Sequence, residues 1–155
     1  MQLFGRFTRL LLLALGGLSL GCQTVREPLP ASGPGWRVQE GQALWRPRVR
    51  LPELGGELVM ASHADGNCVI EFAKAPLPLL VAQTTRTNWF IEFPAQRRRF
   101  AGRGAPSARF AWLYLRAALA GEPLPKGYRF DRRAEGRWRL ENTRSGEALE
   151  GFLAP

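Results

Sequence analysis

The stretch Asn88-Trp89-Phe90-Ile91-Glu92-Phe93 is the clearest indication of the fold. Trp89, Ile91 and Phe93 fall on one side of an extended chain, whereas Asn88 and Glu92 fall on the other side. Alternation of apolar and polar residues with a period of two is typical of a β-strand with one buried face. The stretch therefore predicts antiparallel sheet.

Short runs of the same kind occur on both sides of this stretch and are separated by turn residues. Asp65-Gly66 predicts a tight hairpin turn, whereas Gly55-Gly56 and the prolines at positions 76 and 78 predict interruptions. The predicted strands are residues 41–49, 57–62, 67–73, 79–82, 86–93, 128–131, 137–141 and 147–153.

One helix is predicted between the strands. Ser107 is a plausible N-cap and Gly121 a plausible end, and only Arg109 and Arg116 mark a polar stripe between them. A helix that is apolar nearly all round must be covered on most sides. We therefore expect a mainly β protein with one or two helices (α+β), in which this helix lies on the concave side of a curved sheet or acts as a partly exposed lid.

The N-terminus has the pattern of an export signal. Arg6 and Arg9 precede an apolar run from Leu10 to Leu20, which is about half as long as a membrane-spanning helix must be. The run ends in Leu18-Ser19-Leu20-Gly21-Cys22, which resembles a bacterial lipobox. The resemblance implies that residues 1–21 are removed and that acylated Cys22 attaches the protein to a membrane.

Two further points concern this segment. Gln23, rather than Asp, follows the cysteine, and by resemblance to enterobacterial sorting this favours the periplasmic face of the outer membrane. The alternative is an ordinary signal peptide cut near Gly21. Residues 22–35 are rich in proline and glycine and predict a flexible tether, so residues 36–155 are expected to form the single folded domain.

The charge of the chain favours some partners over others. Its formal net charge is +9, and Arg97-Arg98-Arg99 with Arg103 forms a basic cluster on a predicted loop or strand edge. For an exported lipoprotein, anionic lipid is a more suitable partner than nucleic acid. The alternative is that these arginines are only a solvated surface.

The sequence contains no recognisable catalytic or metal-binding motif. There is one histidine, His63, and apart from Cys22 one cysteine, Cys68, which is expected to be a small buried residue. No nucleophile elbow, zinc spacing or phosphate-binding glycine loop is present. We therefore expect neither an enzyme nor a cofactor or metal.

Several segments together resemble the LolA/LolB-like family of periplasmic lipoprotein carriers and outer-membrane receptors. The resemblance covers roughly residues 41–153 and is carried by residues 56–61, 69–72, 89–93, 113–125 and 138–147. It implies a curved, incomplete antiparallel β-barrel with a helix over its concave face and an apolar cavity. It also implies non-covalent binding of acyl chains in lipoprotein reception or localisation, with a periplasmic carrier as partner.

Such a cavity needs apolar side chains that can repack around an acyl chain. The candidates are Leu58, Met60, Ile70, Phe72, Trp89, Ile91 and Leu113. The alternative for each is an ordinary core position, and the sequence does not reveal which face of the sheet points inward. A second hypothesis is a lipid-anchored interaction or scaffold module for an envelope complex, without a ligand cavity.

Overall fold

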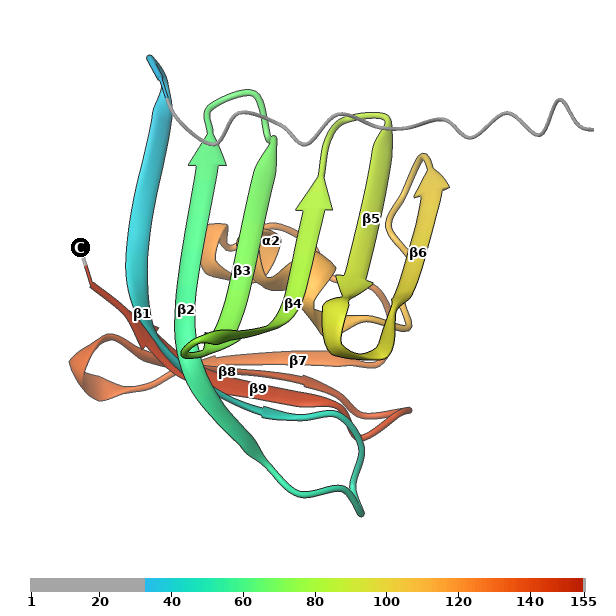
Figure 1. Cartoon of the computed structure of the whole chain (residues 1–155). Coiled ribbons are helices and arrows are strands. Elements are labelled where there is room, and N and C mark those ends of the chain that lie inside the picture. Colours follow the sequence, from blue (N-terminus) through green and yellow to red (C-terminus); the bar gives the residue numbers. More distant parts are fainter. Residues whose placement is uncertain (1–32, 155) are drawn as a thin grey trace, which may run out of the picture.

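The computed structural model describes residues 33–154, which form one open antiparallel sheet of nine strands with short helical segments (Figure 1). The strands are β1 (Trp36–Arg46), β2 (Leu54–His63), β3 (Cys68–Lys74), β4 (Leu77–Thr84), β5 (Asn88–Phe93), β6 (Arg98–Arg103), β7 (Tyr128–Arg132), β8 (Arg137–Asn142) and β9 (Ala148–Leu153). The helical elements are the 3₁₀ turns η1 (Pro94–Gln96), η2 (Ala111–Tyr114) and η3 (Ala134–Gly136) and the α-helix α2 (Leu115–Ala120). The predicted mainly β class is confirmed.

The strand order is β6-β5-β4-β3-β2-β1-β9-β8-β7, so β6 and β7 are the two edges of the open sheet. The sheet is curved: in Figure 1 the strands β7, β8 and β9 run across the direction of β3 to β6. β1 lies at the change of direction, because it pairs with β2 on one side and with β9 on the other.

Glycines permit close contact between strands near this change of direction. A Cβ atom on Gly41 would meet the carbonyl oxygen of Phe152, and one on Gly151 would meet that of Gln42. Side chains at these two positions would therefore push β1 and β9 apart.

Eight of the nine strands overlap a predicted strand, whereas β6 was not predicted. The expected alternation is clearest in β3. In β3 the residues Cys68, Ile70 and Phe72 are buried, as predicted. The Asp65-Gly66 turn joins β2 to β3, and the His63 N–H donates to the Asn67 carbonyl across it at 2.9 Å. The basic cluster lies where it was expected, because Arg97 is in the turn before β6 and the other three arginines are on this edge strand.

Two of the strand interruptions predicted from the sequence, at Gly55-Gly56 and at Pro78, do not occur in the structure. Gly55 and Gly56 are paired residues within β2, opposite Leu44 and Ala43 of β1. A Cβ atom on Gly56 would meet the Ala73 carbonyl oxygen and lie 2.9 Å from the Phe72 ring. The glycine is therefore required by close packing between strands rather than by a turn. Pro78 likewise lies within β4.

The predicted helix over residues 107–120 is shorter than expected. Phe110 is extended, with φ −117° and ψ 110°, and helical structure begins only at Ala111. Ser107 accepts a hydrogen bond from the Arg109 N–H at 3.4 Å and caps no helix. The predicted end is confirmed: Gly121 has a φ of 73°, and its N–H and that of the next residue close a Schellman motif.

The segment formed by η2 and α2 packs against strands from both ends of the strand order. Residues of η2 contact β4, β8 and β9. Trp112 is fully buried, with its ring 5.0 Å from that of Phe72 and 6.0 Å from that of Trp45. Leu115 is also fully buried in the same hydrophobic cluster. These contacts make η2 the centre of the core.

Candidate functional site

The seven predicted cavity residues come together in the structure, but as parts of a packed core. Six of them are at most 5% exposed and belong to one hydrophobic cluster, and Trp89 packs against it. These residues are Leu58, Met60, Ile70, Phe72, Trp89, Ile91 and Leu113. None of them lines the three hollows of residues 33–154 that are described below. Their proposed contact with an acyl chain stays a prediction, and Cys22 lies outside the described residues.

A pocket opens where the aromatic part of the core reaches the surface, and it is called the aromatic pocket here. Its volume is about 260 Å³. It is lined by Trp45, Pro47, Arg48, Leu51, Phe93, Gln96, Arg98, Phe100, Arg109, Phe110, Ser145 and Glu147. These residues come from the ends of β1 and β5, the start of β6, and the connections before β2, η2 and β9.

Four aromatic rings form the apolar wall of this pocket. Phe93 stacks on Trp45 with ring centres 5.9 Å apart, and its ring centre lies 6.2 Å from that of Phe110. Phe100 completes the wall, 5.1 Å from Phe110. Because Trp45 also contacts Trp112, the wall of the pocket is continuous with the middle of the core.

Three arginines surround the opening of the aromatic pocket. The Arg98 guanidinium lies 5.2 Å from the centre of the Phe100 ring, and that of Arg109 lies 5.6 Å from the same ring. Arg48 approaches from the connection between β1 and β2. All three are exposed, and among residues 33–154 none of the ion pairs includes them.

The one carboxyl group of the aromatic pocket is buried rather than paired with an arginine. Glu147 is 5% exposed, and its Oε1 accepts a hydrogen bond from Trp45 Nε1 at 3.0 Å. Its Oε2 accepts a hydrogen bond from the Ala111 N–H at 2.8 Å. Burial raises the pKa of Glu147 to about 7, against the effect of both hydrogen bonds. The carboxyl group thus connects β1 and β9 to the first turn of η2.

A second hollow lies at the end of α2. Its volume is about 490 Å³, and Leu119 of α2 faces Trp138 and Leu153 of the sheet there. Arg37, Arg132 and Arg133 also line it, and Arg132 donates a hydrogen bond to the Leu119 carbonyl oxygen. This hollow is more polar than expected of a site for an acyl chain. One of its arginines, Arg133, forms an ion pair with Glu150.

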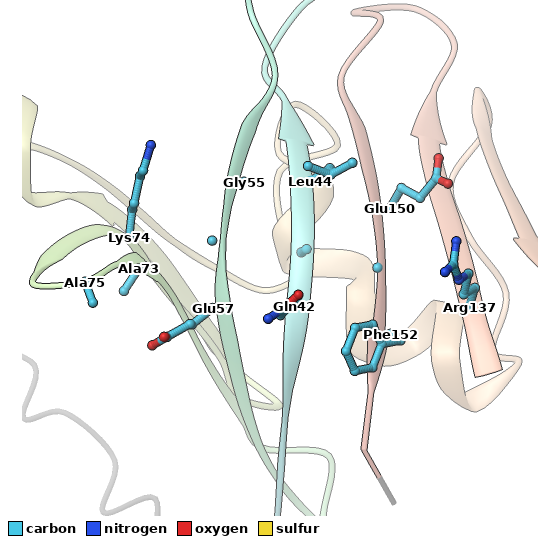
Figure 2. Close-up of a pocket in the computed structure, with 13 residues that line it drawn as sticks. Gln42, Leu44, Gly55, Glu57, Ala73, Lys74, Ala75, Arg137, Glu150 and Phe152 are labelled. Atoms are coloured by element: carbon cyan, nitrogen blue, oxygen red, sulfur yellow. The ribbon is translucent and has the colours of Figure 1, made fainter. Parts of the chain in front are cut away.

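The third hollow, which is larger than the other two, lies on the face of the sheet opposite the core, and it is called the outer hollow here. Its volume is about 550 Å³. It runs across β2, β1 and β9, and Gly55, Gly56 and Gly151 are among the residues that line it. Figure 2 shows its labelled side chains, which include Gln42, Leu44, Glu57, Lys74, Arg137, Glu150 and Phe152. Leu44 and Phe152 are exposed apolar side chains, at 48% and 42%.

Other chemistry is limited in the described part of the chain. Residues 33–154 contain no group of three or more His, Cys, Asp and Glu side chains that could hold a metal ion. Cys68 is buried, and burial raises the pKa of its thiol to about 12, so it is not a reactive nucleophile at neutral pH. No helix in this part of the chain has the length and apolar character needed to cross a membrane.

Sequence reasoning missed the aromatic pocket. The sequence marks Arg109 as part of a polar stripe and Glu147 as a carboxylate of the last strand, and neither assignment indicates a pocket. The usable signal was a single carboxylate directly before a run of small and apolar residues, Ala148-Leu149. That signal is too short to identify a partner more than 100 residues away, such as Trp45.

Comparison with known proteins adds no relative: no family model matches the chain, and no curated protein matches it in sequence.

Proposed function

We propose that this protein is a lipid-anchored envelope protein that binds an acyl chain through the aromatic pocket. Acylated Cys22 would hold it on the periplasmic face of the outer membrane. Its role would be the reception or localisation of lipoproteins, by non-covalent transfer from a periplasmic carrier. The observation that carries the proposal is the continuous aromatic wall from the surface at Phe100 to the core at Trp112.

The fold supports this proposal because an open sheet leaves its apolar face to be covered by something other than strands. In the proposed architecture, an incomplete barrel, the segment of η2 and α2 covers the concave face. This segment is short and partly 3₁₀, which makes it easier to displace than a long helix. An acyl chain could then replace its contacts with the sheet.

The covering segment also carries an unfavourable contact in the closed state. The Trp112 indole N–H is buried without a hydrogen-bond partner, and so is that of Trp138. A buried donor without a partner costs about 1–3 kcal/mol. Movement of η2 would relieve part of this cost for Trp112, which favours repacking around a ligand.

The size of the aromatic pocket limits what enters without such movement. Its volume of about 260 Å³ is slightly below the range of about 300–1,000 Å³ that is typical of small-molecule sites. Only one end of an acyl chain fits there, and each methylene buried beyond it adds about 0.8 kcal/mol. A longer chain requires Phe110 and η2 to shift.

Photocrosslinking in the native membrane tests acyl-chain binding. The full-length chain, expressed in a bacterial envelope, is labelled with a fatty acid that carries a diazirine near its end. We expect crosslinks to residues of the aromatic pocket, and unlabelled fatty acid should compete with them. Crosslinks spread evenly over the exposed surface would contradict the proposal.

A matched pair of variants sharpens this test. Gln96 and Ala95 are both exposed residues of η1, but only Gln96 lines the aromatic pocket. We expect Gln96→Trp to abolish specific crosslinking by filling the opening, and Ala95→Trp to leave it unchanged. Equal crosslinking in both variants would show that the chain does not enter there.

Attachment through Cys22 has a separate test. We expect labelled palmitate to be incorporated into the wild type and not into Cys22→Ser, and the variant to leave the membrane fraction. If the wild type takes up no label and is released from cells in soluble form, the N-terminus is an ordinary signal peptide.

The outer hollow favours a second candidate function, an interaction module for an envelope complex. Its exposed Leu44 and Phe152 could pack against an apolar side chain of a partner protein. A photocrosslinking amino acid placed at Phe152 should then capture one defined protein. The same amino acid at Leu77, which is 64% exposed and outside the hollow, is the control. Absence of a protein adduct specific to position 152 would exclude this function for the outer hollow.

A further inference from the structure

The charges around the aromatic pocket are not balanced by the protein itself. Arg48, Arg98 and Arg109 come from three separate segments and converge on one opening. Four arginines elsewhere on the described surface form ion pairs, for example Arg139, which contacts two carboxylates at 3.1 Å. The three arginines of the pocket have no such carboxylate partner among residues 33–154.

The carboxyl group of Glu147 does not neutralise them. Both of its oxygens accept hydrogen bonds from inside the core, from Trp45 and from the Ala111 N–H. Burial also raises its pKa to about 7, so it is only partly ionised at neutral pH. The opening of the pocket therefore has a net positive charge.

The rings hold two of the guanidinium groups at the boundary between apolar wall and solvent. Arg109 lies 5.4 Å from the centre of Phe110 and 5.6 Å from that of Phe100, which Arg98 also approaches. Stacking on a ring leaves the edge of a guanidinium free to donate hydrogen bonds in its plane. An anion at the opening would thus meet several donors directly above an apolar surface.

We propose that the aromatic pocket selects single-chain anionic amphiphiles, with the tail on Trp45, Phe93, Phe100 and Phe110 and the anionic head between Arg48, Arg98 and Arg109. This inference rests on the proposed function and adds the chemistry of the head group. Carboxylate and phosphate heads share the required geometry, because both accept paired hydrogen bonds from a guanidinium. A free fatty acid and a phosphate monoester of a long-chain alcohol are the two sources.

Competition against the diazirine fatty acid tests this inference, with the full-length chain in phosphatidylcholine nanodiscs. The competitors are decanoate, decyl phosphate, decanol and inorganic phosphate, each used below its micellar concentration and corrected for partition into empty nanodiscs. We expect decanoate or decyl phosphate to displace the probe at a concentration at least about ten-fold lower than decanol does, since hydrogen bonds between charged groups are the strong ones. The better of the two anions identifies the head group.

Variants of the arginines assign the effect to the pocket. With the probe held well below its own dissociation constant, Arg98→Gln and Arg109→Gln should each weaken displacement by the anions about ten-fold and leave that by decanol unchanged. Arg98→Lys keeps the charge without the paired donors and should fall between the two. Arg137→Gln, in the outer hollow, is the control and should match the wild type.

The outcomes separate this inference from the proposed function. Displacement by decanol as effective as by the better of the two anions would overturn head-group selection and leave acyl-chain binding intact. Displacement by inorganic phosphate alone would overturn it too, because the site would then bind free anions without a tail. If the probe gives no pocket-specific crosslink at all, the proposed function fails first and this inference fails with it.

Discussion

The buried carboxyl group of Glu147 should make the stability of this protein depend on pH. Burial raises its pKa from 4.5 to about 7, although the hydrogen bonds from Ala111 and Trp45 favour the ionised form. A pKa that is higher in the folded state means that the folded protein binds the proton more tightly than the unfolded chain does. This contribution is complete below pH 4.5 and disappears as the pH rises through about 7.

The expected size follows from these two values. Between pH 5 and pH 8 the free energy of unfolding should fall by roughly 2–3 kcal/mol through this group alone. That is a large part of the about 5–15 kcal/mol that stabilises a typical domain. The direction is opposite to that of an ion-paired carboxylate, which stabilises the folded state more as the pH rises.

The variant Glu147→Gln isolates this effect, because its side chain does not titrate. Its NH₂ group would face one of the two N–H donors, so we expect it to be about 1–3 kcal/mol less stable than the wild type at pH 5. The difference in stability should change by roughly 2–3 kcal/mol in favour of the variant at pH 8. Urea denaturation followed by tryptophan fluorescence at four pH values between these limits measures both quantities.

This test has a control variant, and one outcome would contradict the argument. Glu57→Gln changes an exposed carboxylate without an ion pair in the described structure, and its stability should follow the pH dependence of the wild type. A gap between wild type and Glu147→Gln that stays constant from pH 5 to pH 8 would refute the argument. Glu147 would then have the same pKa in the folded and unfolded states.

Three other predictions concern stability and reactivity. Gly56→Ala should lower the free energy of unfolding by about 1–3 kcal/mol, because the new methyl group meets strand backbone and a buried ring. Gly55→Ala meets only a leucine methyl group at 3.4 Å and should be nearly neutral. Urea denaturation of both variants measures the difference. Cys68 should react with iodoacetamide only in denaturant, and rapid alkylation of the folded protein at pH 7 would disprove its burial. Arg139→Gln should lower the free energy of unfolding by no more than about 1 kcal/mol, because its ion pairs with Glu141 and Glu150 are partly exposed. A loss of stability that persists unchanged in 1 M salt would mean that the effect is not electrostatic.

Most strands, and the residues that share a face of each, could be predicted from local sequence because side chains alternate strictly along an extended chain. Cys68, Ile70 and Phe72 in β3 illustrate this, since their spacing places them on one face and the structure shows that this face is buried. The helix was predicted less well. Its end at Gly121 depends on a local backbone conformation, whereas its start depends on Glu147, which accepts a hydrogen bond from the Ala111 N–H.

The candidate site was predictable only in its composition. The seven apolar candidates lie in or against one hydrophobic cluster, but the sequence could not distinguish a cavity wall from a packed core. That distinction depends on how closely β1, β9 and η2 approach one another. Gly56 shows the same difficulty, because the sequence suggested a turn and the structure uses the glycine for contact with Phe72.

By itself, the sequence determined a mainly β domain and the approximate positions of eight of its nine strands, because these follow from the period-two pattern of neighbouring residues. Only the tertiary structure decided where the molecule is hollow and which charges meet there. The aromatic pocket joins Trp45 to Glu147, 102 residues apart in the chain. Contacts of that separation arise from the curvature of the whole sheet, and no local pattern specifies them.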